Sequence, residues 1–223
     1  MANLYFFDID GTLVNLTSVH AEAYITAYRK VLGAEAKGIK REEIIATFGM
    51  ADRAQHKQIF EKHNLSDKGR MARIMKAYEK LFLDDLNLVK VKPLPGVVNF
   101  LDYLKKHGDY IGIVHGGPRH KGETILKKAG LYNYFSLFGY NEGFNERKEI
   151  LRNIIKKAKE KGCRFKKIIV IGDTREDIKA GKAERTITVA VATGTETKEN
   201  LKMGKPDIIV STLKQYQEIL KKI

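Results

Sequence analysis

The stretch Leu4-Tyr-Phe-Phe-Asp-Ile-Asp-Gly-Thr12, near the start of the chain, decides which fold the sequence predicts. Its first four residues are all apolar, as in a strand that is buried on both faces of a parallel sheet. Asp8 and Asp10 follow this strand, and residues two apart in an extended chain point to the same side. We therefore expect both carboxylates at the carboxyl edge of a sheet, where open α/β sheets bind their ligands. The alternative interpretation is a surface Asp-Gly turn.

Further apolar runs, bounded by Asp, Gly or Pro, alternate with segments of helical periodicity. The segments 97–104 and 150–158 each carry an apolar stripe, and a glycine soon follows each of them as a helix stop. This alternation predicts an α/β fold, a Rossmann-like core of three layers around a mainly parallel sheet. The other predicted strands are Tyr110–Val114, Ile168–Ile171, Ile187–Ala192 and Ile208–Val210.

The stretch from Val14 to Leu88 shows no convincing strand pattern, and helical periodicity dominates it. It is followed by Lys92-Pro-Leu-Pro-Gly96, in which two prolines make a rigid connector. We therefore predict two parts. Residues 1–14 and 89–223 form the α/β core, and residues 15–88 form a small all-helical domain inserted after the first strand.

The chain of 223 residues has 41 Lys and Arg against 27 Asp and Glu, which is a formal net charge of +14 at pH 7. Such an excess is compatible with nucleic acid, an acidic membrane surface or a phosphorylated substrate as partner. The basic residues are spread along the chain, often beside Glu, and form no long uninterrupted block. We interpret most of them as a solvated, charged surface.

The number of cysteines and the length of the apolar runs limit the cellular environments that we expect for the protein. Cys163 is the single cysteine, which excludes a disulfide framework and a Cys-rich zinc site. No apolar run approaches the ~20 residues that a membrane helix needs. The first residues carry no basic leader of the kind that opens a signal peptide. We expect a cytoplasmic protein with no membrane partner.

A second pair of acidic residues follows a second buried strand. Asp173 comes directly after the run that ends in Gly172, and Asp177 is four residues later, so it can face back toward Asp173 from a helix. Crowded carboxylates repel one another unless a cation or a proton compensates them. Hard oxygen ligands that leave room for water suit Mg²⁺. The alternative interpretation is helix capping by Asp173 with a solvated Asp177.

Asp8-Ile-Asp-Gly-Thr12 and Gly172-Asp-x-x-x-Asp177, in this order and each after a strand, resemble the motifs of the haloacid dehalogenase (HAD) superfamily of phosphohydrolases. The predicted helical insertion is similar to the C1-type cap domain of the phosphoglycolate phosphatase-like branch of that superfamily. Three further segments are similar to the same branch: 171–181, 189–194 and 205–207.

The resemblance implies a role for each acidic residue. Asp8 would be the nucleophile that attacks phosphorus and forms an aspartyl-phosphate. Asp10 would protonate the leaving oxygen and then act as the base on the hydrolytic water. Mg²⁺ would be bound by the Asp8 side chain, the Asp10 backbone carbonyl and Asp173, and Asp177 would bind it through water or orient that shell.

The sequence departs from the family pattern at the second motif, an apolar strand that normally ends in a phosphate-binding Ser or Thr. Here the strand ends in His115, whose imidazole can donate a hydrogen bond to phosphate, and Gly116 and Gly117 can add backbone N–H groups. The alternative is that His115 is only a loop residue. Gly11, which permits an unusual turn, and Thr12, which offers a hydroxyl, complete the predicted phosphate-binding residues.

The family's third motif is a Lys or Arg at the start of a helix that precedes the last acidic strand. Arg147 and Lys148 both stand in this region, and spacing does not choose between them. We slightly favour Lys148 as the cation that offsets the carboxylates and the phosphate. Either residue can instead be a solvent-facing charge.

The function that these residues favour is a Mg²⁺-dependent phosphatase for a small phosphorylated metabolite, acting as a monomer or homodimer. A phosphosugar mutase on the same scaffold is an alternative, because the aspartyl-phosphate can be passed to another hydroxyl. A non-catalytic, basic nucleic-acid-binding protein is the alternative of a different class. The sequence shows no recognised nucleic-acid module, and this alternative leaves both acidic strand ends unexplained, so we do not expect a nucleic-acid partner.

Overall fold

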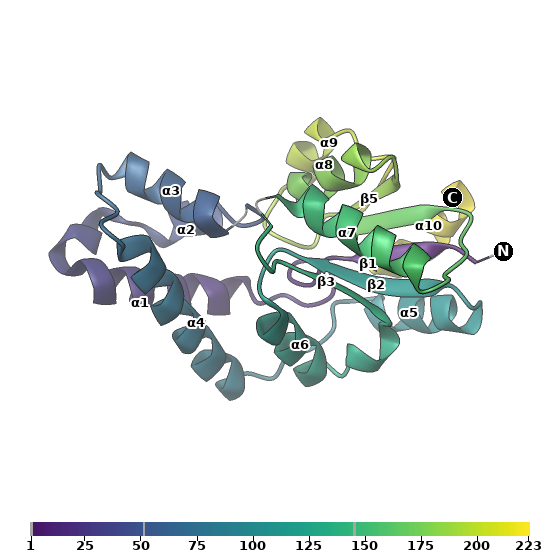
Figure 1. Ribbon diagram of the computed structural model, residues 1–223, viewed down its shortest axis with the longest axis horizontal. Coiled ribbons are helices and arrows are strands. Elements are labelled where there is room, and N and C mark those ends of the chain that lie inside the picture. The colour runs from purple at the N-terminus through teal and green to yellow at the C-terminus, as the bar shows by residue number, and fades with distance from the viewer. Residues whose placement is uncertain (1, 51, 145) are drawn as a thin grey trace. The chain divides into compact units, whose positions relative to one another are not determined.

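The computed structural model describes residues 2–50, 52–144 and 146–223 and confirms the predicted α/β fold. The chain divides into two compact units (Figure 1). The core unit consists of Met1–Asn15 and Val91–Ile223, and the helical unit consists of Leu16–Lys90.

Within the described residues, the core unit contains one parallel sheet of six strands in the order β3-β2-β1-β4-β5-β6. Phe7, the last residue of β1, pairs in register with Ile113 of β2 and Ile171 of β4. The residues that follow these three strands therefore meet at one edge of the sheet. The strands are β1 (Leu4–Phe7), β2 (Tyr110–His115), β3 (Leu137–Tyr140), β4 (Ile168–Gly172), β5 (Ile187–Val191) and β6 (Ile208–Val210).

Helices cover both faces of the sheet, with α5 and α6 on one side and α7, α8 and α9 on the other (Figure 1). The two faces explain why the first strand is apolar throughout. Leu4 and Phe6 belong to the cluster that includes the apolar stripe of α7, whereas Tyr5 and Phe7 each lie edge-on to Phe100 of α5, with ring centroids 5.9 Å apart. The helices are α5 (Val97–Lys106), α6 (Arg119–Lys128), α7 (Arg147–Glu160), α8 (Arg175–Ala183), α9 (Lys198–Met203) and α10 (Tyr216–Lys222), with short 3-10 turns at Tyr132–Tyr134 and Leu213–Gln215.

The strand β3 is the one strand of the sheet that the sequence pattern does not predict. It has four residues, lies at the edge of the sheet and contains Gly139. A Cβ atom on Gly139 would lie 3.1 Å from Cγ2 of Ile150, so the glycine gives α7 the space to pack closely on this strand. A short run that includes a glycine carries too weak a pattern to be recognised as a strand.

The helical unit is built from α1 (Thr17–Leu32), η1 (Gly33–Gly38), α2 (Arg41–Ile45), α3 (Asp52–Lys62) and α4 (Arg70–Leu88). Its interior is aromatic, and two histidine rings within it are hydrogen-bonded to tyrosine hydroxyls. The ring of His20 stacks on Phe82 at 4.2 Å, and its Nδ1 lies 2.6 Å from the hydroxyl of Tyr78. A second pair joins the Tyr28 hydroxyl to Nδ1 of His56 at 2.7 Å. These contacts give the unit an interior of its own.

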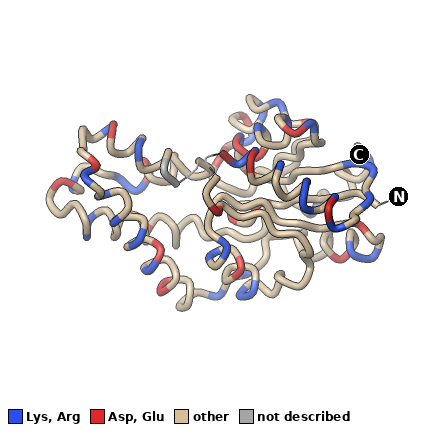
Figure 2. The backbone as a smooth tube through the Cα atoms, in the orientation of Figure 1, with Lys and Arg blue, Asp and Glu red and all other residues tan. Residues whose placement is uncertain are grey.

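Charged residues of both signs occur together on both units (Figure 2). Several form exposed i,i+4 pairs, such as Lys57–Glu61 and Lys156–Glu160, which contribute little to stability. Among the described residues, none of the helices combines the length and the apolar character that crossing a membrane requires.

The packing of the helical unit gives a prediction on stability. Phe82 is fully buried, and Phe82→Ala should lower the free energy of unfolding by about 3–5 kcal/mol, because it leaves a cavity against the His20 ring. Leu88 ends the same helix with 85% of its surface exposed, so Leu88→Ala should change it by less than about 0.5 kcal/mol. Urea denaturation at pH 7 measures both variants. Equal effects of the two substitutions would contradict this packing.

Candidate active site

Three acidic side chains meet at the carboxyl edge of the sheet. Asp8 follows β1, Asp173 follows β4, and Asp177 lies in the first turn of α8. All three are buried, and one carboxylate oxygen from each lies within 4.8 Å of the others. The register of β1 with β4 brings the first two together, and the helix that follows β4 brings the third.

Glycine residues lie against two of these carboxylates. A Cβ atom on Gly194 would lie 1.7 Å from Oδ2 of Asp173, and one on Gly11, whose φ is +86°, would lie 2.2 Å from the same oxygen. A Cβ atom on Gly172 would lie 2.2 Å from Cγ of Asp177. A side chain at any of these glycines would displace an acidic group, so their absence of a Cβ is what permits the cluster.

The hydroxyl of Thr12 donates a hydrogen bond to Oδ1 of Asp173 at 3.0 Å, and Thr12 is fully buried. The backbone N–H of Gly11 donates to the carbonyl of Val14 at 2.7 Å. The Thr12 hydroxyl and the Gly11 N–H are therefore used within the protein, and Thr12 holds Asp173 in place. That Gly11 and Thr12 also contact a phosphate stays a prediction.

Asp177 has two tasks at the start of α8. Its Oδ2 accepts hydrogen bonds from the N–H and the hydroxyl of Thr174, at 3.1 and 2.6 Å, and so closes a capping box. Its Oδ1 faces Arg147. The N-cap is therefore Thr174 rather than Asp173, and Asp177 is buried rather than solvated.

Asp10 lies beside this cluster but is not one of its three members among the residues that the structure describes. It is half-buried, and its negative charge is one of those that raise the pKa of Asp173. Asp10 is thus close enough to act on Asp173, and its place beside the Asp8 carboxylate stays a prediction.

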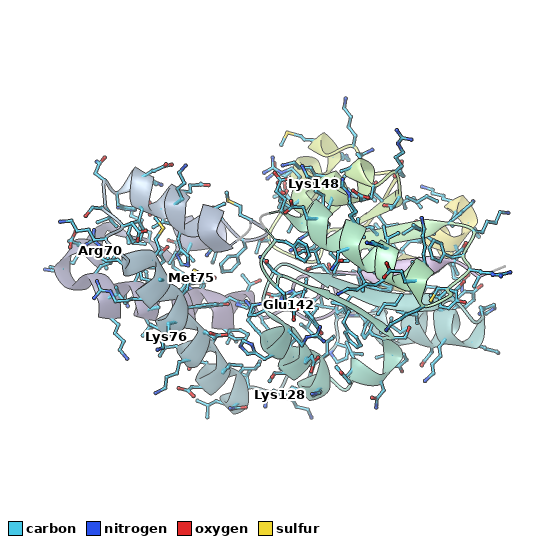
Figure 3. All side chains as sticks on the ribbon, in the orientation of Figure 1. Arg70, Met75, Lys76, Lys128, Glu142 and Lys148 are labelled. Atoms are coloured by element: carbon cyan, nitrogen blue, oxygen red, sulfur yellow. The ribbon has the colours of Figure 1, made fainter. Side chains whose placement is uncertain are left out.

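The cation at the carboxylates is Arg147, the first residue of α7. Its Nη1 lies 2.8 Å from Oδ1 of Asp8 and also pairs with Oδ1 of Asp177. Lys148 instead pairs with Glu146 and leaves 39% of its side chain exposed on the outer side of α7 (Figure 3). The slight preference for Lys148 is therefore corrected. Consecutive helical residues point in different directions, and the forked guanidinium of Arg147 can contact two carboxylates at once.

His115 ends β2, and its side chain is buried beside Asp8. Nδ1 of the ring lies 3.7 Å from Oδ1 of Asp8. Within the described residues, neither ring nitrogen has a hydrogen-bond partner. A buried polar atom without a partner is costly, so this imidazole is suited to meet a ligand next to Asp8.

Gly116 and Gly117 form a strip of backbone that three basic side chains approach. A Cβ atom on Gly116 would lie 3.2 Å from Nη2 of Arg147, and one on Gly117 would lie 2.8 Å from Nε2 of His115 and 2.6 Å from Cε of Lys121. Lys121 is buried in α6 and is not among the residues assigned from the sequence. The available signal was its position one helical turn beyond Gly117.

The charges around Asp8 act in opposite directions. Burial raises the pKa of Asp8, but Arg147 and His115 outweigh it and hold that pKa below its ordinary value. Burial, together with the charges of Asp8 and Asp177, raises the pKa of Asp173 well above its ordinary value. Burial also raises the pKa of Asp177, to about 6, against the effect of Arg147. Asp8 is thus ionised at neutral pH, whereas its acidic neighbours favour a proton or a cation.

The acidic side of the site has the donor set of a magnesium centre. It offers hard carboxylate oxygens that are close together, buried and incompletely neutralised by Arg147. The raised pKa values of Asp173 and Asp177 show that an additional positive charge is favourable there. Asp8, Asp173 and Asp177 therefore fit a Mg²⁺ ion, because this ion prefers few carboxylates and retains water.

Removal of the Arg147 charge gives a second prediction. Arg147→Met should raise the pKa values of Asp8 and Asp177 in the folded protein, because the positive charge beside them is lost. The folded variant then binds protons that the unfolded chain releases, so its stability falls as pH rises. In EDTA, we expect a loss of about 3–5 kcal/mol at pH 8 and a smaller loss at pH 5.

Lys148→Met is the matched control, because this neighbouring cation lies outside the carboxylate cluster. It should leave the free energy of unfolding unchanged at both pH values. Urea denaturation of the three proteins at pH 5 and pH 8 measures the effect. A loss at Arg147→Met that is the same at both pH values would mean that the residue only packs.

Comparison with known proteins identifies the family of this chain. The model of the haloacid dehalogenase-like hydrolase family matches residues 5–191. A putative pyrophosphatase PpaX of Clostridium perfringens is 25% identical over 223 residues, which cover 100% of this chain and 99% of that protein. A phosphoglycolate phosphatase of Aquifex aeolicus is 28% identical over 188 residues, which cover 84% of each chain.

Solved structures show the same fold. A predicted phosphatase from Clostridium acetobutylicum superposes with a TM-score of 0.83 and 17% identity over 100% of both chains. A β-phosphoglucomutase from Clostridium difficile superposes with a TM-score of 0.81 and 20% identity, covering 100% of this chain and 97% of that one. The resemblance that the two acidic motifs carry is thereby confirmed: the chain is an enzyme that belongs to the haloacid dehalogenase-like hydrolase family.

Proposed function

We propose that the protein is a Mg²⁺-dependent phosphatase that hydrolyses a small-molecule phosphomonoester through an aspartyl-phosphate intermediate. The observation that carries this proposal is the environment of Asp8. Its carboxylate is buried between Arg147, at 2.8 Å, and the acidic pair Asp173 and Asp177. Relatives named phosphoglycolate phosphatase and pyrophosphatase support a phosphoryl-transfer reaction.

Asp8 is the nucleophile in this proposal. The low pKa of Asp8 keeps its carboxylate ionised, so an oxygen lone pair is available to attack phosphorus. A bond forms between an Asp8 carboxylate oxygen and phosphorus as the bond from phosphorus to the leaving oxygen breaks. Water then hydrolyses this acyl phosphate, which releases inorganic phosphate and restores the Asp8 carboxylate.

Asp10 is the proposed acid and base. It protonates the leaving oxygen in the first half of the reaction and takes a proton from the attacking water in the second. Its half-buried position beside the cluster, two residues from Asp8, supports this role.

Arg147, His115 and the backbone N–H groups of Gly116 and Gly117 are the proposed phosphate-binding groups. Arg147 and His115 approach the same oxygen of Asp8, so both lie where a phosphoryl group would meet the nucleophile. Burial is the main cause that lowers the pKa of His115, so the imidazole is neutral and donates one hydrogen bond. Mg²⁺ held by Asp8, Asp173, Asp177 and the backbone carbonyl of Asp10 would neutralise the charge between the anionic nucleophile and the phosphate.

We propose that the helical unit, Leu16–Lys90, is the cap domain of the enzyme and that Asn15 and Val91 mark its two connections to the core. Its separate aromatic interior supports this role, because a cap must remain folded while it moves as a body. We further propose a cytoplasmic location, which suits the free thiol of Cys163.

Family membership overturns the interpretation of a non-catalytic nucleic-acid-binding protein. A phosphosugar mutase shares the fold, as the β-phosphoglucomutase structure shows, but at 20% identity this likeness concerns the fold alone. Release of inorganic phosphate, as opposed to formation of an isomeric sugar phosphate, distinguishes the two reactions.

A panel of phosphate esters tests the nucleophile. The wild type should release phosphate with Mg²⁺ and lose this activity in EDTA. Asp8→Asn should lower kcat/KM by at least about a thousandfold, because the amide is a poor nucleophile. Asp84→Asn, at an exposed position of α4, is the control and should retain the wild-type value. Full activity of Asp8→Asn would sink the proposed mechanism.

The metal gives a further prediction. Mg²⁺ should raise the melting temperature strongly at pH 8 and little at pH 5, because protons compete with the ion for Asp173 and Asp177, whose pKa values are raised. Asp173→Asn should abolish the increase at pH 8, and Asp84→Asn should retain it. A Mg²⁺ effect that is equal at both pH values would contradict binding at these carboxylates.

A further inference from the structure

Lys121 lies within the same unit as Asp8 and has no part in the reaction proposed above. It projects from the first turn of α6 and is only 5% exposed. A lysine so deeply buried in a protein nearly always serves a specific electrostatic purpose. Other lysines of the same helix, such as Lys128, are exposed (Figure 3).

The position of Lys121 relative to His115 follows from the backbone between them. A Cβ atom on Gly117 would lie 2.9 Å from Nζ of Lys121 and 2.8 Å from Nε2 of His115. Both nitrogens therefore lie around one point above Gly117, close enough to contact a single small anion. A side chain at residue 117 would fill this space.

His115 has two edges that face different surroundings. Nδ1 is the nitrogen that lies 3.7 Å from Asp8, so this edge faces the reacting centre. Nε2 is on the opposite part of the ring, and this is the side on which Lys121 lies. Lys121 therefore lies farther from Asp8 than the Nδ1 edge of His115 does. The ammonium of Lys121 carries a full positive charge and N–H donors, so it can contact an anionic group on the Nε2 side of the ring.

The surroundings of this point contain unused polar atoms. Among the described residues of the core unit, the buried side-chain atoms without a hydrogen-bond partner are both ring nitrogens of His115 and the hydroxyl of Tyr140. Tyr140 ends β3 and is the register partner of His115, with ring centroids 6.5 Å apart. Unpaired buried polar atoms that lie near one another are typical of a site for a polar ligand.

We propose that Lys121 is a specificity-determining residue that binds, beside His115, a second anionic group of the substrate. The substrate class is then a small phosphate ester or anhydride that carries a carboxylate or a further phosphate close to the transferred phosphoryl group. This inference rests on the proposed phosphatase function and deepens it, because it assigns the charge of the part of the substrate that does not react.

Two esters that differ in the second anion alone test the proposal. Phosphoglycolate and ethyl phosphate have similar size, and only the first has a carboxylate. Lys121→Met should lower kcat/KM for phosphoglycolate by about 10- to 100-fold, mainly through KM, because a charge-assisted contact is lost. The value for ethyl phosphate should fall by no more than about threefold. Lys121→Arg should restore most of the phosphoglycolate activity, and Lys128→Met is the matched control.

Pyrophosphate is the third substrate and distinguishes a phosphate from a carboxylate as the second group. Equal losses of Lys121→Met on phosphoglycolate, pyrophosphate and ethyl phosphate would overturn the proposal, since the residue would then act on the transferred phosphoryl group or on the fold. Unchanged values on all three would overturn it as well. Melting temperatures of the variants separate a loss of fold from a loss of contact.

Titration calorimetry on the Asp8→Asn protein with Mg²⁺ measures the affinity for each ester without turnover, and so tests the contact with the second anionic group. Phosphoglycolate should bind more tightly than ethyl phosphate, and Lys121→Met in this background should remove the difference. Equal affinity for the two esters before that substitution overturns the proposal. Failure of the phosphatase proposal gives a different result, in which wild type with Mg²⁺ hydrolyses none of the esters whatever their affinity.

Discussion

The structure of the site depends on the mutual repulsion of carboxylates that the fold forces together. Pairing of β1 with β4 brings Asp8 and Asp173 to one edge, and the turn into α8 adds Asp177. Three buried negative charges at this spacing are unstable without compensation. Arg147 supplies part of it from the start of α7, and the negative charge that remains favours a cation at this edge. The proposed binding of Mg²⁺ is thus a consequence of the topology and of an arginine that does not neutralise the cluster alone.

Glycine backbone serves both sides of Asp8. On the acidic side, Gly11 and Gly194 leave room for the Asp173 carboxylate. On the basic side, Gly116 and Gly117 let Arg147, His115 and Lys121 approach the loop after β2. In both places a missing Cβ brings charged groups nearer to one another than side chains would allow. The separation of acidic from basic groups around Asp8 therefore depends as much on glycines as on charged residues.

The parts of the fold and site that follow from short-range pattern were predictable. The apolar runs of β1 and β4 and the acidic residues directly after them are local features, and parallel pairing alone brings them together. Other features depend on long-range contacts. Helical phase decides between Arg147 and Lys148, and the hydroxyl of Thr12 is used by a residue 161 positions away. The burial of Lys121 likewise leaves no mark in the local sequence pattern. The edge strand β3 is too short and glycine-interrupted to have a pattern.

The net charge of +14 takes on a more limited meaning in this structure. Most Lys and Arg lie at the surface among acidic residues (Figure 2), where water and salt screen them and their attraction for an anion is weak and unspecific. Lys121 is buried and the Arg147 side chain is only 11% exposed, so a lower effective dielectric constant would strengthen the contact of each with the proposed anion. In this proposal the two shielded cations decide which anion is bound, whereas the excess surface charge affects only how often anions arrive.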